Sequence, residues 1–391
     1  MSAVELKKGV YWVGVKNPEL RVFDIIMTTK KGTTYNSYLI VDEKITLIDT
    51  VKDGYQDEFL KNIKSLIGDR KIDYLVVHHT EPDHSGSLRK ILETYEDIVV
   101  YASKPALINI REITNMNFNG VEAKEELNIG DRTLKFISAP FLHWPDTIFT
   151  YSEKDKILFT CDAFGCHYCD ENSIFNDEVG DFSDEFRYYY DVIMGPFKKY
   201  VVSAIEKIKN IDFDMVCTSH GPVLRRDVNK YIDLYEKWSR EGIYEEEKSA
   251  VVAYVSAYGY TKQIAEAITN GLKENGVNVY LYDISESNLS EIVDKIERSK
   301  ALLVGSPTIN QDAVKPVWDL LSLICPINNR GKIATAFGSY GWSGEAVPML
   351  IDRLKGLKFN TEIEGLKVKF KPSEDDLIKA KELGNMIANR I

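Results

Sequence analysis

Six residues, His79 to His84, constrain the fold of this chain more strongly than any other segment. They contain two imidazoles and two carboxylates and come directly after the apolar run Tyr74 to Val77 and one further residue. The run predicts a buried strand, and Pro82 and Gly86 predict a turn after it. Side chains at the end of a rigid strand can converge on one point. Their mixture of oxygen and nitrogen donors suits iron or manganese better than a thiolate zinc site. A polar loop with a capping acid is the alternative.

Three more candidate metal ligands occur downstream in the same setting. His143, Asp162 and His220 each lie just beyond an apolar run. The runs that precede them are Leu134 to Ser138, Ile157 to Cys161, and Phe213 to Ser219. A sheet would present side chains in such positions along one edge. Four of the six histidines follow this pattern, which argues against a set of unrelated core residues.

This pattern resembles the metallo-β-lactamase fold and, more narrowly, the flavodiiron proteins, and the resemblance covers the whole chain. The wider hydrolase superfamily carries His-x-His-x-Asp-His and usually binds zinc, whereas here Glu81 stands at the second His position, as in the flavodiiron pattern. A carboxylate favours a harder, redox-active metal and helps to neutralise two cations held close together. The resemblance therefore implies two Fe ions per chain.

The resemblance also assigns the ligands. It implies that one iron is held by His79, Glu81 and His143, that the other is held by Asp83, His84 and His220, and that Asp162 bridges the two. In some family members the residue equivalent to His84 is turned away from the metal.

Composition indicates two domains and no membrane segment. A chain of 391 residues exceeds the size of a usual single core. No apolar stretch approaches the roughly 20 residues that span a bilayer, and the N-terminus lacks the layout of a secretory signal, so we expect a cytoplasmic protein. The net charge of −11 argues against a nucleic-acid partner.

The loop after Asp162 contains two further features. Cys166 and Cys169 form a C-x-x-C motif. Such a motif can be a redox or zinc pair, but we interpret it as structural. A rubredoxin-like iron centre would need a second C-x-x-C motif, and the chain has none. His167 is predicted to donate a hydrogen bond or a proton near the metals, an ordinary loop histidine being the alternative. Trp144, next to His143, is predicted to wall the metal pocket or to belong to the core.

The charged, aperiodic segment Lys237 to Lys248 predicts a linker or an exposed helix end. We therefore place an iron-binding domain at 1–247 and a second domain at 248–391. In the first domain, predicted helices at Gln56 to Ile67 and Lys104 to Thr114, with antiparallel strands within Thr33 to Ile48, fit an αββα metallo-β-lactamase-like sandwich.

The second domain alternates strands and helices, which predicts a doubly wound, five-stranded parallel sheet. Its first strand leads into a small polar loop and then a helix, an arrangement that binds phosphate. An ordinary turn with Thr261 as the helix N-cap is the alternative. The residues of this loop are Ser256, Ala257, Tyr258, Gly259, Tyr260 and Thr261.

Two later loops fall at the carboxyl ends of neighbouring strands, beside the topological switch point. The second loop contains Ser306, Pro307, Thr308, Ile309 and Asn310, and the third contains Ser339, Tyr340, Gly341, Trp342, Ser343 and Gly344. Glycines let the backbone approach a flat ring, and an aromatic side chain would stack on it. The region resembles flavodoxin, which implies FMN; a nicotinamide domain is disfavoured because no G-x-G-x-x-G follows the first strand.

The resemblance implies an oxidoreductase that reduces O₂ to water or NO to N₂O, with electrons passing through FMN. It also implies an external donor, rubredoxin or reduced coenzyme F420, and a head-to-tail homodimer or a dimer of dimers. We expect Trp144 and Trp342 near the junction between chains. Two alternatives are a zinc hydrolase with an accessory flavodoxin domain and an electron carrier or redox sensor with a vestigial metal site.

Overall fold

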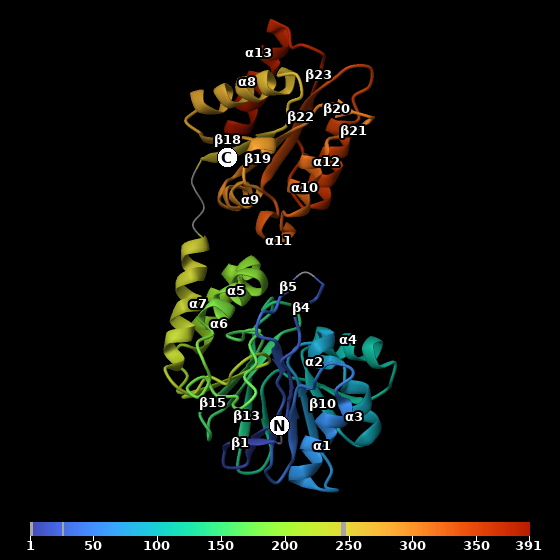
Figure 1. Ribbon diagram of the computed structural model, residues 1–391, viewed down its shortest axis with the longest axis vertical. Helices are drawn as coiled ribbons and strands as arrows, with labels where there is room; N and C mark the ends of the chain where they lie inside the picture. The colour runs from blue at the N-terminus through green and yellow to red at the C-terminus, as the bar shows by residue number, and fades with distance from the viewer. Residues whose placement is uncertain (1–2, 26, 244–247) are drawn as a thin grey trace. The chain divides into compact units, whose positions relative to one another are not determined.

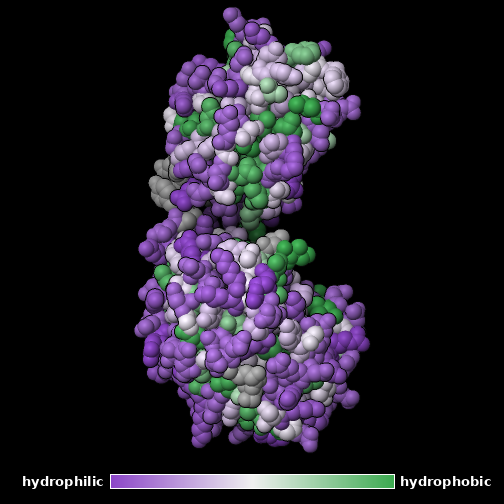
Figure 2. Space-filling view, viewed as in Figure 1, coloured by the Kyte–Doolittle hydropathy of each residue, from purple (hydrophilic) through white to green (hydrophobic). Residues whose placement is uncertain are grey.

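The computed structural model describes residues 3–25, 27–243 and 248–391, and it divides the chain into two compact units, Met1–Glu241 and Gly242–Ile391. Figure 1 shows the course of each unit, and Figure 2 shows a mainly hydrophilic surface with scattered hydrophobic patches. The predicted boundary after residue 247 stays a prediction, because residues 244–247 lie outside the described ranges. Lys237 to Ile243 belong to helix α7 (Val228–Ile243). Within the described residues, no helix is long and apolar enough to cross a bilayer.

Two sheets form the centre of the first unit. The seven-stranded sheet has the order β1 (Val4–Lys7), β2 (Val10–Trp12), β7 (Tyr38–Ile40), β8 (Thr46–Ile48), β9 (Tyr74–Val77), β10 (Val99–Ala102), β11 (Asn119–Glu122). The five-stranded sheet has the order β12 (Glu126–Asn128), β13 (Thr133–Ser138), β14 (Ile148–Ser152), β15 (Ile157–Cys161), β16 (Met215–Thr218). One hydrophobic cluster contains residues of both sheets, such as Trp12 and Phe159, and so fills the space between them.

Helices cover the outer faces of both sheets. Those beside the seven-stranded sheet are α1 (Gln56–Ile67), α2 (Pro82–Ser85), α3 (Leu88–Thr94) and α4 (Lys104–Thr114). Those beside the other sheet are α5 (Ser183–Tyr189), α6 (Lys198–Ile208) and α7, with the short helical turns η1 (Tyr190–Met194) and η2 (Gly195–Phe197) after α5 (Figure 1). The predicted αββα sandwich is therefore confirmed.

Two small antiparallel ribbons supplement the sheets. One pairs β3 (Val15–Asn17) with β6 (Thr33–Tyr35), and the other pairs β4 (Val22–Phe23) with β5 (Met27–Thr28). Phe23 and Tyr35 point into the core beside the candidate metal ligands, because the ring centroids of both lie within 6 Å of the His220 ring centroid, at 5.6 and 5.9 Å.

The second unit is built on a parallel sheet with the strand order β18-β17-β19-β22-β23. The strands are β17 (Ser249–Tyr254), β18 (Asn278–Asp283), β19 (Ala301–Gly305), β22 (Ile333–Tyr340) and β23 (Leu366–Lys369), and a hairpin of β20 (Thr308–Ile309) and β21 (Asp312–Ala313) follows β19. The helices are α8 (Tyr260–Glu274), α9 (Leu289–Arg298), α10 (Lys315–Ser322), α11 (Pro326–Asn329), α12 (Ala346–Gly356) and α13 (Glu374–Ala388), with the 3-10 turn η3 (Ile284–Glu286). This confirms the predicted doubly wound fold.

Both faces of this sheet are buried. Alternate residues of β17 contact different clusters: Val251 faces α9, α10 and α12, whereas Val252 faces α8 and α13. Helices α8 and α13 cross without side chains between them, because a Cβ at Gly271 would lie 2.1 Å from the Lys381 carbonyl oxygen. A Cβ at Gly384 would lie 2.3 Å from the Ile268 carbonyl oxygen, so neither position accommodates a larger residue.

Candidate metal centre and flavin site

The loops at the ends of four strands carry the candidate metal ligands. The segment after β9 turns into the short helix α2, which begins at Pro82, a residue suited to the first position of a helix. The chain therefore reverses sharply and turns Glu81, Asp83 and His84 inward. His143 lies between β13 and β14, Asp162 follows β15 directly, and His220 lies two residues after the end of β16.

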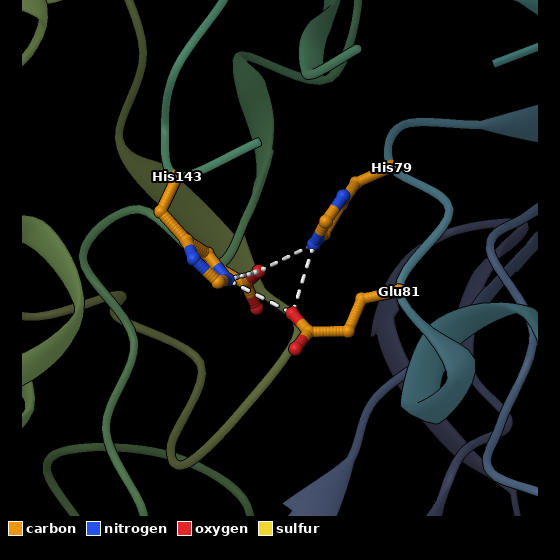
Figure 3. Close-up of side chains that lie close together, drawn as sticks. His79, Glu81 and His143 are labelled. Carbon is orange, nitrogen blue, oxygen red and sulfur yellow. Dashed lines mark hydrogen bonds and ion pairs between the residues drawn. The ribbon is translucent and has the colours of Figure 1, made fainter. Parts of the chain in front are cut away.

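The first group of ligands contains His79, Glu81 and His143 (Figure 3). The Glu81 Oε2 atom lies 3.1 Å from His79 Nε2 and 2.8 Å from His143 Nε2. The Oδ2 atom of Asp162 lies 3.3 Å from His79 Nε2 and 3.6 Å from His143 Nε2. Four ligand residues from three segments of the chain therefore converge on one small volume.

The second group contains Asp83, His84 and His220. The Asp83 Oδ2 atom lies 2.9 Å from His220 Nε2 and 3.4 Å from His84 Nε2. The other oxygen of Asp162, Oδ1, lies 2.9 Å from His84 Nε2 and 3.6 Å from His220 Nε2. Asp162 thus directs one oxygen to each group, and the structure brings all seven sequence-predicted ligands together, His84 included.

Hydrogen bonds around the histidines test whether metal ions fit between them. His220 Nδ1 donates to the Thr34 carbonyl oxygen at 2.7 Å, so in the neutral ring Nε2 carries a lone pair that faces the Asp83 carboxylate. Both oxygens of Asp83, together with Asp162 Oδ2, are buried without a hydrogen-bond donor. Lone pairs that face one another in a buried site require a cation between them, and this donor set fits iron.

The ionisation behaviour of the site agrees with this requirement. Burial alone lowers the pKa of His79, but hydrogen bonds with Asp146, Asp162 and Glu81 outweigh burial and raise the pKa. Burial raises the pKa of Glu81, yet its hydrogen bonds with His143 and His79 are stronger and lower it. Burial also raises the pKa values of Asp162 and Asp146, but the interactions with neighbouring histidines outweigh burial and lower them. Glu81, Asp162 and Asp146 therefore remain ionised and favour positive charge among them, which bound metal ions would supply.

Sequence reasoning missed the residues that orient the ligands. Asp146 is fully buried; its Oδ1 lies 3.3 Å from His79 Nδ1, and its Oδ2 accepts a hydrogen bond of 3.0 Å from the Thr80 amide. His78, directly before the first ligand, lies 2.7 Å from both Asp49 Oδ2 and Thr150 Oγ1. The sequence signal for Asp146 was its position three residues after the candidate ligand His143. No neighbouring residue in the sequence indicated the contacts of His78.

His167 and Trp144 both lie beside the metal ligands. His167 Nδ1 is 3.0 Å from Thr33 Oγ1, and its ring centroid is 4.9 Å from those of His220 and Tyr189. Burial lowers the pKa of His167, and the ring lines a cavity of about 280 Å³. The Trp144 ring centroid lies 5.0 Å from that of His79, so Trp144 contacts a ligand at the side of the site.

All five cysteines are free. Cys166 is buried, its Sγ lies beside the backbone of Gly221, and burial raises the pKa of the thiol. Burial likewise raises the pKa of Cys169 to about 11. Both thiols therefore stay protonated at neutral pH and behave as small packing groups, in line with the structural interpretation.

In the second unit, the three predicted loops surround a cavity of about 370 Å³, a size within the usual range for cofactor sites. The predicted residues that line it are Ala257, Tyr258, Tyr260, Pro307, Thr308, Ile309, Asn310, Ser339, Tyr340, Gly341, Trp342 and Ser343. Gln311 and Phe370 also line it and were not predicted. Tyr258 and Trp342 are 84% and 81% exposed at its mouth, positions from which aromatic rings stack on a flat ligand.

The remaining predicted residues do not line the cavity, and several of them form contacts that support the three loops. Gly259 has a φ of 78° and occupies the N-cap of α8, so the alternative with Thr261 as the cap is wrong. Thr261 Oγ1 instead contacts Ser339 Oγ at 2.9 Å, and Ser256 Oγ accepts a hydrogen bond from the Lys262 amide. Ser306 Oγ accepts one from the Val314 amide. Amides at the first turn of α8 suit a phosphate group.

Fold and site together define a class of protein that joins a di-metal β-lactamase-like unit to a flavodoxin unit. Residues 33–221 match the family model described as ODP family beta lactamase, and residues 252–384 match the flavodoxin model. The Flavo-diiron protein FprA2 of Clostridium acetobutylicum is 43% identical over an alignment that covers all of both chains. The chain therefore belongs to the flavodiiron protein family.

Two further proteins, one compared by sequence and one by its solved structure, are also similar to this chain over nearly its whole length. The nitric oxide reductase of Moorella thermoacetica is 36% identical, and the alignment covers 99% of this chain and 98% of that protein. The solved structure of rubredoxin oxygen:oxidoreductase from Desulfovibrio gigas is 30% identical, covers 100% of this chain and 98% of its own, and has a TM-score of 0.65.

Proposed function

We propose that this protein is an oxidoreductase that reduces O₂ to water, or two NO to N₂O, at a diiron site supplied with electrons through FMN. The observation that carries the proposal is the presence, in one chain, of a complete set of seven converging ligands and a three-loop flavin cavity. Relatives named for both gases support the reaction class. When bound, the two irons and FMN supply the electrons that the gas accepts.

The residues of the metal centre have distinct proposed roles. His79, Glu81 and His143 would hold one iron, and Asp83, His84 and His220 would hold the other. Asp162 would be shared by both, because each of its oxygens faces one group. Asp146 fixes the ring of His79 and keeps its Nε2 free for metal. Burial of the ligands excludes bulk water. Trp144 and His167 close the sides of this pocket.

In the flavin cavity, the amides at the start of α8 hold the phosphate, and the loops after β19 and β22 hold the ring. Tyr258 and Trp342 stack on it. Electrons come from an external donor, rubredoxin or reduced coenzyme F420. A head-to-tail homodimer, or a dimer of such dimers, brings the flavin of one chain beside the metals of its partner. The five free cysteines suit a reducing compartment such as the cytoplasm.

Metal analysis and anaerobic gas consumption test the proposal together. Protein expressed with iron and riboflavin is expected to contain about two irons and one FMN per chain, and to consume O₂ or NO once reduced. Mass spectrometry measures the metals, absorbance measures the flavin, and gas electrodes measure turnover. Zinc in place of iron without flavin absorbance, together with ester or thioester hydrolysis, would indicate the hydrolase instead.

A further inference from the structure

A chain of hydrogen bonds links the outer helix α4 to the candidate metal ligand His79. Asn109, in the middle of α4, donates from Nδ2 to Thr80 Oγ1 at 2.9 Å. The Thr80 hydroxyl in turn contacts Asp146 Oδ2, and Asp146 Oδ1 lies 3.3 Å from His79 Nδ1. Three successive contacts therefore connect a residue of an outer helix to an imidazole that faces the metal.

The donors and acceptors of this chain fix its direction. An amide nitrogen only donates, so the Thr80 oxygen accepts the proton from Asn109. The single hydroxyl proton of Thr80 is then left for Asp146 Oδ2, which also accepts a hydrogen bond of 3.0 Å from the Thr80 amide. Without Asn109 the Thr80 hydroxyl is free to rotate, and the carboxylate that orients His79 loses one of its two donors.

Helix α4 also holds the backbone of Asp146. Ser103, the N-cap of α4, accepts a hydrogen bond of 3.3 Å from the Ala106 amide and donates one of 2.7 Å to the Asp146 carbonyl oxygen. The N-cap contact fixes the first turn of the helix. One helix thus contacts Asp146 at its carbonyl group directly and at its carboxylate through Thr80.

The chain ends in a part of the fold that is closed to solvent. Asp146 and His79 are fully buried, Thr80 is 1% exposed, and Asn109 is half-buried. A hydrogen bond lost in such surroundings is not replaced by bulk water, so its loss is costly. Asn109 lies at the outer end, where a substitution disturbs the chain without removing a metal ligand.

The second group of ligands has no comparable link to α4. His220 Nδ1 donates directly to the Thr34 carbonyl oxygen, and within the described part of the chain His84 Nδ1 has no hydrogen-bond partner. A carboxylate partner orients a ligating imidazole and raises its basicity. An effect transmitted from α4 should therefore reach the metal at His79 and not the metal at the second group.

Resting on the proposed function, we infer that Asn109 is a positioning residue for the metal held by His79, and that it acts through Thr80 and Asp146. A group that contacts a metal ligand directly changes metal affinity about 10- to 100-fold. Asn109 lies two contacts further from the metal, so its contribution to affinity at this position is smaller, about three- to tenfold. Its contribution at the second position is negligible.

The test measures binding of Co²⁺ to the full, metal-free chain by calorimetry. His220→Ala leaves only the first position complete, and His143→Ala leaves only the second. Asn109→Leu is introduced into each of these backgrounds, because leucine has the branched shape of asparagine but cannot donate a hydrogen bond. The control is Ile108→Ala, which truncates an exposed neighbour on α4 without a change of charge.

We expect Asn109→Leu to weaken Co²⁺ binding about three- to tenfold in the His220→Ala background and about twofold or less in the His143→Ala background. Ile108→Ala should leave both affinities unchanged. Asn109→Gln keeps an amide donor and should retain most of the affinity. If leucine prevents folding, Asn109→Ala provides the same comparison, and we expect it to show the same preference for the first position.

A double-mutant cycle with Thr80→Val tests the route. Because Thr80→Val breaks the chain closer to the ligand, Asn109→Leu should have no further effect on Co²⁺ affinity in that background. Losses that multiply, equal losses at both metal positions, or an unchanged affinity in the His220→Ala background would overturn the inference.

These affinities do not depend on gas turnover. If wild-type protein loaded with iron and FMN and then reduced consumes neither O₂ nor NO, the proposed function fails, while the Co²⁺ affinities still decide the role of Asn109.

Discussion

Asp162 is the residue on which the two halves of the metal centre depend. Its Oδ2 faces His79 and His143, and its Oδ1 faces His84 and His220. It is 1% exposed and follows β15 directly, so the strand fixes its position. Removal of this side chain takes away both a shared ligand and a negative charge that two close cations require.

Asp162→Ala is therefore expected to abolish gas reduction, by about 100-fold or more, while FMN binding and reduction stay within about twofold. Iron content and gas consumption are measured on the same sample. Glu171→Ala, which removes an exposed acid of the same loop, is the control and should behave as wild type. Gas turnover within a few-fold of wild type in Asp162→Ala would show that the bridge assignment is wrong.

Asp146 acts on the metal through His79. Asp146→Ala leaves the buried Nδ1 of His79 without its carboxylate partner and releases the Thr80 amide. We expect affinity for iron to fall about 10- to 100-fold, with FMN affinity unchanged. Competition with a chelator measures the iron affinity, and iron binding equal to wild type would contradict the positioning role.

At the residue scale, the sequence revealed the candidate metal ligands and not the residues that orient them. The seven ligands share a visible rule, since each follows an apolar strand. Asp146 and His79 are 67 positions apart in the sequence. No local sequence pattern predicts a hydrogen bond between residues so far apart in the chain. Thr261 illustrates a different limit: its residue type suits an N-cap, but the left-handed backbone of Gly259 places the cap two residues earlier.

Among the elements, three turns of the first unit are joined by one guanidinium. Arg132, between β12 and β13, donates to Asp42 in the β7–β8 turn at 2.9 Å and to Asp155 in the β14–β15 turn at 2.8 Å. Its side chain is 8% exposed. Because β7 and β12 belong to different sheets, this ion network holds the two layers together at one end.

The ion pair between Arg132 and Asp42 predicts how the stability of the fold depends on pH. Burial raises the pKa of Asp42, but the hydrogen bonds from Arg132, Glu43 and Asp131 outweigh burial and lower it. The pair thus stabilises the fold above the unfolded pKa of about 4, and this contribution is lost as pH falls through the lower folded value. Asp42→Asn should destabilise the protein by about 1 to 3 kcal/mol at pH 7.

Thermal unfolding of wild type and Asp42→Asn at pH 7 and near pH 3 measures this difference. The gap in Tm should narrow at the lower pH, where the wild-type carboxyl becomes protonated. A gap that is constant across this range would show that the charge of Asp42 contributes nothing and that only its shape matters.

Elements with a strong hydrophobic period were predictable to the residue, as α1 and α4 show. Short elements were not. The β20–β21 hairpin depends on left-handed backbone at Asn310 and Gln311. Asparagine favours this conformation, but glutamine gives no turn signal. Strand β22 extends to Tyr340, into the predicted third loop, because pairing with β23 continues through the small residues Gly338 and Ser339.

For the whole molecule, the central question is how electrons reach the metals from a flavin held by a separate unit. Our prediction is transfer between chains of a head-to-tail homodimer, in which an isologous contact places each flavin beside the partner's metals. Trp144 and Trp342 are predicted to lie near that junction.

Co-expression of two defective chains tests this arrangement. One chain carries Asp162→Ala, and the other carries Ser256→Ala with Thr261→Ala to weaken the flavin loop. A mixed dimer then contains one intact flavin facing one intact metal pair, so we expect partial recovery of gas consumption, about half of wild type at most. Verified mixed dimers without activity would rule against transfer between chains.

Helices α8 and α13 contact each other closely at two glycines. Helix α13 therefore helps to hold α8, whose first turn lies at the phosphate end of the flavin site, in position. Gly271 and Gly384 let the two backbones touch, so the position of the first turn of α8 is set by a segment more than a hundred residues away. Gly384→Ala should force the helices apart and weaken FMN binding about tenfold or more, as fluorescence titration measures. A substitution remote from every flavin contact would thus release the flavin.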